Sequence, residues 1–126
     1  MSIPGLEGRK VLVVEDESLV AMLLETMLED MGCTVFGTAA RVPDALEMIA
    51  GDDLPDAALL DVNVAGQTVY PVAEILDRKG VPLVFSTGYG QAGLAEAWEG
   101  RPTVQKPYTE AMIQQALMQV LDVRNA

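Results

Sequence analysis

Short apolar runs alternate with segments of helical periodicity along the chain, and this alternation constrains the fold more than any other feature. Strands are predicted at 10–14, 33–38, 57–60, 81–86 and 103–105, and helices at 17–31, 43–51, 71–80, 91–99 and 109–121. Strands and helices that alternate in this way form a parallel sheet with helices on both faces. We therefore expect a doubly wound (βα)5 domain of the α/β class, with a five-stranded parallel sheet.

The segment 17–31 has apolar residues at helical spacing, which predicts an amphipathic helix with an inward apolar face. These residues are Leu19, Val20, Leu23, Leu24, Met27, Leu28 and Met31. Pro43 and Pro71 suit the first turns of the next two helices, and Thr109 is a predicted N-cap of the last one. The segment 62–67 is expected to be a loop.

Composition restricts the function classes open to this chain. At 126 residues it fits one domain, expected to span 1–126. The net charge of −11 argues against nucleic-acid binding, which needs lysine and arginine to neutralise phosphates. No apolar stretch is long enough to cross a bilayer, and Cys33 has no second cysteine to pair with. These features favour a cytoplasmic protein without membrane or nucleic-acid partners.

Three acidic residues come directly after predicted strands. Glu15 and Asp16 follow the first strand, and Asp61 follows the third. Because the carboxyl ends of parallel strands meet at one crevice, these carboxylates can converge. Crowded carboxylates repel one another unless a cation lies among them, and an oxygen-only ligand set favours Mg²⁺. Taken alone, Glu15 and Asp16 are more typical of a solvated helix start; the matching positions of Asp61 and Lys106 favour the metal site.

Asp61 is placed to act as a nucleophile at this edge of the sheet. Its carboxylate would attack a phosphoryl donor and form an acyl phosphate. Lys106, after the fifth strand, would supply positive charge, and the Thr87 hydroxyl, after the fourth, a hydrogen bond. Ser86 and Thr87 are adjacent, so their side chains face opposite ways and only one can reach the phosphoryl group; we choose Thr87. The sequence thus predicts a small magnesium-dependent phosphoryl site.

Residues 11–17, 59–63, 81–88 and 106–107, taken together and in this order, resemble the receiver domain of two-component response regulators. The resemblance implies a flavodoxin-like fold with strand order 2-1-3-4-5. It also implies a signalling protein that catalyses only its own phosphorylation and dephosphorylation, and is not a conventional enzyme.

The resemblance assigns roles to the acidic residues and their neighbour. Glu15 and Asp16 are similar to the acidic pair that holds Mg²⁺ in receivers. Asp61 is similar to the phosphoacceptor, which is also a metal ligand. The backbone carbonyl of Asn63 matches a further metal ligand.

The resemblance also implies a switch. Thr87 is similar to the switch hydroxyl and Lys106 to the lysine that pairs with the phosphoryl group. The bond before Pro107 is expected to be cis, which X-Pro bonds adopt at low cost. Receivers usually carry an aromatic residue three positions before the lysine, but Thr103 stands there, so the usual aromatic switch is absent.

The stretch 85–90 resembles the Phe-Ala-Thr-Gly-Tyr-Gly motif of a subgroup of single-domain receivers. That resemblance implies histidine kinases of the HWE and related classes as partners. Tyr89 and Asn63 match two variable positions that tune loss of the phosphoryl group in this family. We expect the loop around Tyr89 and the short fourth helix to transmit phosphorylation in place of a buried aromatic.

The implied partners are a histidine kinase or phosphotransfer protein and a downstream protein target. That target would bind the face of the fourth helix, fifth strand and fifth helix, unless the domain serves as a phosphate sink.

Three other functions are open to such a sheet. A magnesium-dependent phosphatase or hydrolase with an Asp nucleophile usually has a second acid where this chain has Asn63. A flavin carrier needs a phosphate-binding loop where Glu15 and Asp16 stand. A degenerate receiver would act only as a binding module, although all five site residues are present.

Overall fold

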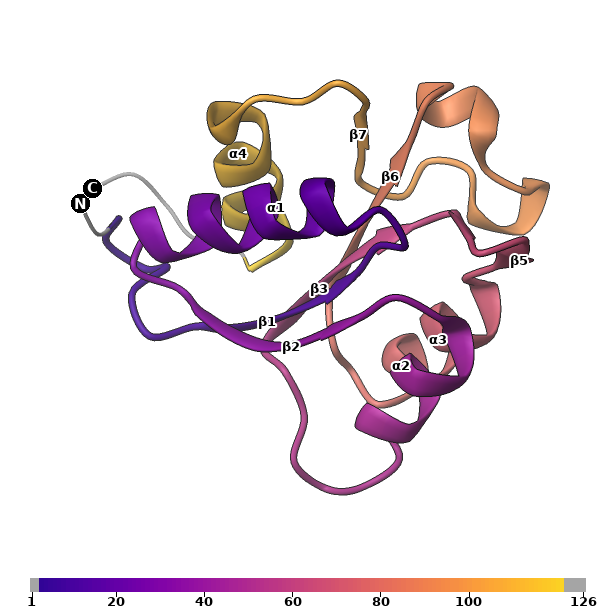
Figure 1. The fold of residues 1–126 in the computed structure, drawn as a ribbon, viewed down its shortest axis with the longest axis horizontal. Helices are drawn as coiled ribbons and strands as arrows, with labels where there is room; N and C mark the ends of the chain where they lie inside the picture. The colour runs from indigo at the N-terminus through magenta and orange to yellow at the C-terminus, as the bar shows by residue number, and fades with distance from the viewer. Residues whose placement is uncertain (1–2, 122–126) are drawn as a thin grey trace.

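A computed structural model of the protein describes residues 3–121, except for the side chain of Gln91. The expected domain 1–126 therefore includes two end segments, 1–2 and 122–126, that lie outside the described residues. Figure 1 shows a central sheet with helices on both faces. None of the described helices combines the length and the apolar character needed to cross a membrane.

The main sheet is parallel throughout. Its strands are β1 (Lys10–Val14), β2 (Thr34–Ala39), β3 (Ala57–Asp61), β6 (Leu83–Thr87) and β7 (Thr103–Gln105). They lie in the order β2-β1-β3-β6-β7, which is 2-1-3-4-5 when the strands of this sheet are counted along the chain. Every residue of β3 and β6 is buried, as expected for inner strands of a parallel sheet covered on both faces. The predicted doubly wound fold is confirmed.

The helices form the two outer layers. The structure has α1 (Ser18–Asp30), α2 (Val42–Met48), α3 (Tyr70–Arg78) and α4 (Glu110–Val120). Helices α1 and α4 cover one face of the sheet, and α2 and α3 cover the other (Figure 1). Successive residues of β1 supply the two cores alternately, because side chains on a strand alternate between faces. Leu12 and Val14 lie in the core under α2 and α3, and Val11 and Val13 in the core under α1 and α4.

The predicted helix signals act where they were expected. Pro43 and Pro71 lie in the first turns of α2 and α3. Thr109 caps α4, since its Oγ1 accepts a hydrogen bond from the Met112 N–H at 3.2 Å.

The apolar face of α1 differs from the prediction. Its buried residues are Ala21, Leu24, Met27 and Leu28. Leu19 and Leu23 were expected to face inward but are 80% and 51% exposed. The seven apolar positions cover more of the helix circumference than the sheet can bury. The periodicity therefore predicted the helix correctly, but it assigned too many residues to the buried face.

The segment 91–99 was predicted to be one short helix, and that prediction is wrong. The chain forms two 3₁₀ helices instead, η1 (Gly90–Gly93) and η2 (Glu96–Trp98). Gly90, which has φ of 58°, and Gly93 both lie within η1. An α-helix of this length must offset a costly nucleus with few residues, and two glycines raise that cost.

The segment 62–67 was expected to be a loop, but most of it forms a small antiparallel hairpin. Its strands are β4 (Asn63–Val64) and β5 (Gln67–Thr68). Ala65 and Gly66 make the turn with φ of 50° and 82°. Two successive positive φ angles are typical of the type I′ turn, whose twist matches that of a two-residue hairpin.

Candidate functional site

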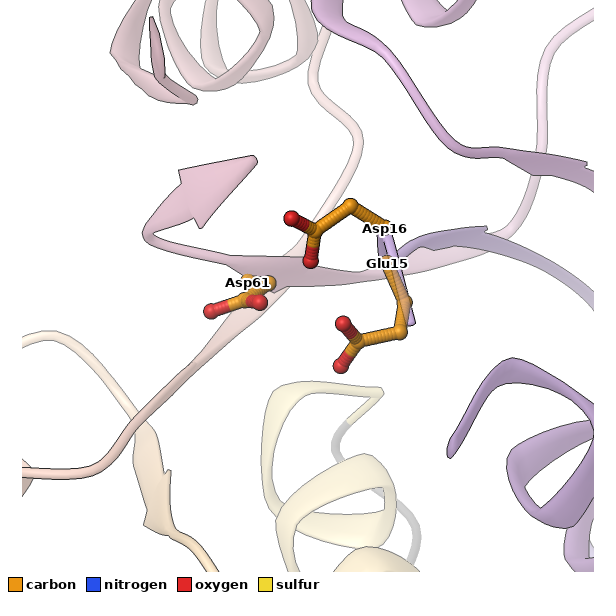
Figure 2. A group of neighbouring side chains, drawn as sticks. All are labelled: Glu15, Asp16 and Asp61. Atoms are coloured by element: carbon orange, nitrogen blue, oxygen red, sulfur yellow. The ribbon is translucent and has the colours of Figure 1, made fainter. Parts of the chain in front are cut away.

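Three carboxylates meet at the carboxyl ends of β1 and β3. Glu15 and Asp16 directly follow β1, and Asp61 is the last residue of β3. The parallel pairing of Val14 with Leu60 places these strand ends side by side. One carboxylate oxygen from each of the three residues lies within 4.8 Å of the others (Figure 2). The structure therefore brings together the three acids that the sequence pointed to.

Lys106 joins two of these acids. Its Nζ lies 2.9 Å from Glu15 Oε1 and 3.0 Å from Asp61 Oδ2. The Lys106 N–H donates to the Thr87 carbonyl at 2.9 Å, which fixes the backbone of the lysine beside the end of β6. The Lys106–Pro107 peptide is cis, as expected. Only 1% of the Glu15 side chain and 24% of the Lys106 side chain are exposed, so solvent screens this ion pair weakly.

Three groups of this cluster have shifted pKa values, and the cause differs from one to the next. Burial raises the pKa of the Glu15 carboxyl above its usual value, although hydrogen bonds from Lys106 and the Glu17 N–H oppose the shift. The Ala65 N–H, 2.9 Å from Asp16 Oδ2, lowers the pKa of that carboxyl. Burial alone would lower the pKa of Lys106, but its hydrogen bonds and charge interactions with Glu15 and Asp61 outweigh burial and raise it. Asp16 and Lys106 are therefore ionised at neutral pH.

The residues of this cluster fit a hard divalent cation. One ammonium group stands against three carboxylates, which leaves negative charge at the strand ends. All the side-chain donors are oxygens, the ligands that Mg²⁺ prefers. Glu15, Asp16 and Asp61 would hold the ion. The side chain of Asn63 is exposed at the start of β4, and the role of its carbonyl as a ligand stays a prediction.

Ser86 and Thr87 lie next to the cluster, and both are buried. Ser86 lines a small cavity together with Leu24, Leu59 and Tyr108, under α1 and α4. Thr87 ends β6, and its Oγ1 accepts a hydrogen bond from the Tyr89 N–H at 3.1 Å. The two neighbouring side chains diverge, which leaves Thr87 as the hydroxyl at the strand end.

Two of the predicted tuning and switch positions, Tyr89 and Thr103, lie in the loop after β6 and on β7. Tyr89 is exposed in the loop after β6. Thr103 stands opposite Phe85 in the pairing of β6 with β7, and its Oγ1 donates to the Arg101 carbonyl at 2.8 Å. An aromatic side chain nevertheless packs on Phe85, because the Trp98 ring meets it edge to face at 5.6 Å.

Sequence reasoning missed two contacts at this site. The Ala65 N–H donor to Asp16 belongs to the unexpected hairpin, and backbone donors carry no sequence signal of their own. The close packing of Gly93 on Thr87 was missed as well. The glycines of this loop were visible in the sequence, but which side chain needs the space is a property of the fold.

The comparisons agree with this arrangement. The family model of the response regulator receiver domain matches residues 11–118. The phyllosphere-induced regulator PhyR of Methylorubrum extorquens is 30% identical over 115 residues, which cover 89% of this chain and 43% of that protein. The chain therefore spans less than half of that relative.

Two solved structures are similar over nearly the whole chain. SdrG from Sphingomonas melonis Fr1 is 39% identical with a TM-score of 0.80, and the match covers 96% of this chain and 100% of that one. The receiver domain of PhyR from Erythrobacter litoralis is 32% identical with a TM-score of 0.81, over 95% of each chain. With the family match, the sheet order and the acidic cluster in agreement, this chain belongs to the response regulator receiver domain family of two-component signalling.

Proposed function

We propose that this chain is a stand-alone receiver that accepts a phosphoryl group on Asp61 in a magnesium-dependent reaction. The observation that carries the proposal is the cluster of Glu15, Asp16 and Asp61, with the Lys106 ammonium bound to two of them. The donor is a histidine kinase, including the HWE class, or a phosphotransfer protein in the cytoplasm. The phosphorylated domain then contacts a downstream protein or serves as a phosphate sink. The match to SdrG, which covers 100% of the solved chain, supports this proposal.

The chemistry follows from the positions of the charges. An Asp61 carboxylate oxygen attacks the phosphorus, the bond from phosphorus to the donor atom breaks, and the donor leaves with that electron pair. A carboxylate oxygen attacks without transferring a proton, so this step needs no general base. The Lys106 ammonium is placed to pair with a phosphoryl oxygen, and the Thr87 hydroxyl can donate to another once it leaves the Tyr89 N–H. Mg²⁺, when bound, supplies positive charge against the transferring phosphoryl group.

Intact-mass spectrometry after incubation with acetyl phosphate tests this function. With Mg²⁺ we expect a single phosphoryl adduct per chain, and with EDTA in place of Mg²⁺ we expect none, because three carboxylates with one ammonium repel the donor. A hydrolase would instead release phosphate through many turnovers without an accumulating adduct. A degenerate receiver would give no adduct from acetyl phosphate or from phosphorylated histidine kinases, and either result would contradict the proposal.

The exposed apolar residues of α1 support a protein donor that docks beside the acids. Leu19, Met22 and Leu23 are among the few large hydrophobic side chains exposed in the described part of the chain. They lie in the first turns of α1, a few residues after Glu15 and Asp16. A contiguous apolar patch at the rim of a site is typical of a protein interface. We infer that the histidine-bearing partner covers these residues while it presents its phosphoryl group to Asp61.

A double variant Leu19→Ala, Leu23→Ala tests this docking surface. We assign about 1 kcal/mol to each truncation, and the two together correspond to roughly thirtyfold slower transfer from phosphorylated histidine kinases of the source organism. Labelling by acetyl phosphate should stay unchanged, since a small donor does not use the docking surface on α1. Gln119→Ala on α4 is the control and should alter neither reaction. Equal loss with both donors would show damage to the site and contradict the docking surface.

The downstream partner is assigned to the face of η1, η2, β7 and α4. A groove of about 230 Å³ lies between β7 and α4 on this face. Its lining side chains carry no charge, and they include Thr103, Gln105, Met112 and Gln115. An uncharged groove on a chain with a net charge of −11 supports a partner contact there.

A further inference from the structure

Thr87 packs so closely on Gly93 that no residue with a side chain would fit at position 93. Thr87 is buried at the end of β6, and its Oγ1 accepts the Tyr89 N–H. A β-carbon placed on Gly93 would overlap Thr87 Oγ1, and would lie only 3.2 and 3.3 Å from its Cβ and Cγ2. In the observed rotamer of Thr87, position 93 therefore accepts only glycine.

The Thr87 hydroxyl rests against η1 at the end of β6. Helix η1, which contains Gly93, packs against β6 and β7. Asp61 is on β3, the neighbour of β6 on its other side, where it pairs with Ser86. The contacts with Gly93 and the Tyr89 N–H thus hold the Thr87 side chain on η1, whereas the phosphoryl group would form on the neighbouring strand β3.

The chain after Gly93 is fastened to α3 through aromatic side chains. The Ala95 N–H donates to the Tyr70 hydroxyl at 2.7 Å. The Tyr70 ring stacks on Trp98 at 5.9 Å and 9°, and both rings meet Phe85 edge to face. The Arg101 guanidinium lies 5.0 Å from the Trp98 ring centre. A displacement of η1 would therefore change the packing of these rings, and one of them belongs to the single tryptophan of the chain.

We propose that Gly93 is a positioning residue for Thr87: its missing side chain lets the hydroxyl rest on η1, and withdrawal of the hydroxyl towards Asp61 releases η1 and the Tyr70–Trp98 stack. This inference rests on the proposed phosphorylation of Asp61. In this proposal the steric contact between Gly93 and Thr87 couples phosphorylation to η1, a role that an aromatic residue at position 103 has in most receivers. The physical basis is that a β-branched side chain has few rotamers, so a methyl group at position 93 displaces the hydroxyl instead of merely crowding it.

The test uses Gly93→Ala and the phosphoryl mimic beryllofluoride with Mg²⁺, followed by amide NMR and Trp98 fluorescence. In the free variant we expect the Tyr89 amide signal to move towards its position in the beryllofluoride complex of the wild type. We also expect up to roughly tenfold tighter binding of the mimic, because the variant already populates the binding-competent rotamer. An unchanged Tyr89 amide with unchanged affinity would overturn the proposal.

Two further variants separate positioning from a general loosening of the loop. Gly88→Ala lies in the same turn, and its β-carbon would meet no atom within 4 Å, so we expect its affinity to stay within about twofold of wild type. Thr87→Ala removes the Oγ1 and Cγ2 atoms that a β-carbon at position 93 would meet, so Gly93→Ala should have no effect on affinity in that background. An equal effect in both backgrounds would mean that Gly93 acts only on loop structure.

The wild-type protein supplies a measurement that does not depend on the folding of any variant. Saturation with beryllofluoride should shift the Tyr89 and Gly93 amides and change the Trp98 emission. If the mimic binds and the Gly93 amide stays in place, this inference fails while the proposed function stands. If the mimic does not bind and acetyl phosphate gives no adduct, the proposed function fails and the inference falls with it.

Discussion

Asp61→Asn should abolish the phosphoryl adduct that acetyl phosphate and Mg²⁺ form on the wild-type chain. Asparagine has the shape of aspartate, but its neutral amide oxygen is a poor nucleophile. We expect labelling to fall by at least roughly 10²-fold, as activity does when an enzyme loses its nucleophile. Intact mass after a fixed incubation measures the adduct, and circular dichroism checks that the variant keeps its fold.

The matched control for this change is Asp52→Asn. It makes the same chemical substitution on an exposed residue between α2 and β3, far in the fold from the strand ends that form the site. Its labelling should equal that of the wild type. If Asp61→Asn still gains a phosphoryl group, peptide mapping to Glu15 or Asp16 would show that another member of the acidic cluster is the acceptor. Our assignment of Asp61 would then be wrong.

The parts of the site that could be predicted from sequence are those fixed by strand ends. In a parallel sheet all carboxyl ends share one edge, so a residue that follows an apolar run is placed there without knowledge of side-chain packing. Glu15, Asp61 and Lys106 were located in this way. The strand order came from the family resemblance, since strand patterns alone leave several orders open.

The parts that could not be predicted depend on neighbours. Periodicity over 17–31 indicates a helix, but only the surrounding elements decide that Leu24 is buried and Leu19 exposed. Gly93 lies inside the segment 91–99 that was predicted as an α-helix, and no packing contact was predicted for it there. Its packing on Thr87 shows a steric requirement instead, which appears only when η1 is placed beside β6.

Lys106→Met should slow phosphoryl transfer from acetyl phosphate by roughly 10²–10³-fold, the usual cost of losing one charged donor to the developing transition state. Methionine keeps most of the aliphatic stem, so the change removes mainly the ammonium. Stopped incubation and intact mass give the rate. Lys10→Met is the control, because Lys10 pairs with the exposed Asp53 at 3.3 Å and lies at the opposite end of β1 from the site.

Lys106→Met should also lose stability, by an amount that depends on pH. Without Lys106, the buried Glu15 carboxylate faces Asp61 with no cation, and its already raised pKa rises further. A folded-state pKa above the ordinary value of 4.5 means that the folded protein binds more protons than the unfolded chain as pH rises from that value. The free energy of unfolding must therefore fall as pH increases through this window.

Urea unfolding at pH 4.5 and at neutral pH measures this effect. We expect the free energy of unfolding of Lys106→Met to lie only slightly below that of wild type at the lower pH. At neutral pH this deficit should reach roughly 2–4 kcal/mol, as when one partner of a buried ion pair is removed. Lys10→Met should stay within about 1 kcal/mol of wild type, because surface ion pairs contribute little. Mg²⁺ should narrow the deficit of Lys106→Met at neutral pH, since a cation bound by the same carboxylates replaces the lost ammonium. A deficit that is equal at both pH values and indifferent to Mg²⁺ would mean that Lys106 stabilises the fold by packing, and that the carboxylates are not held together by its charge.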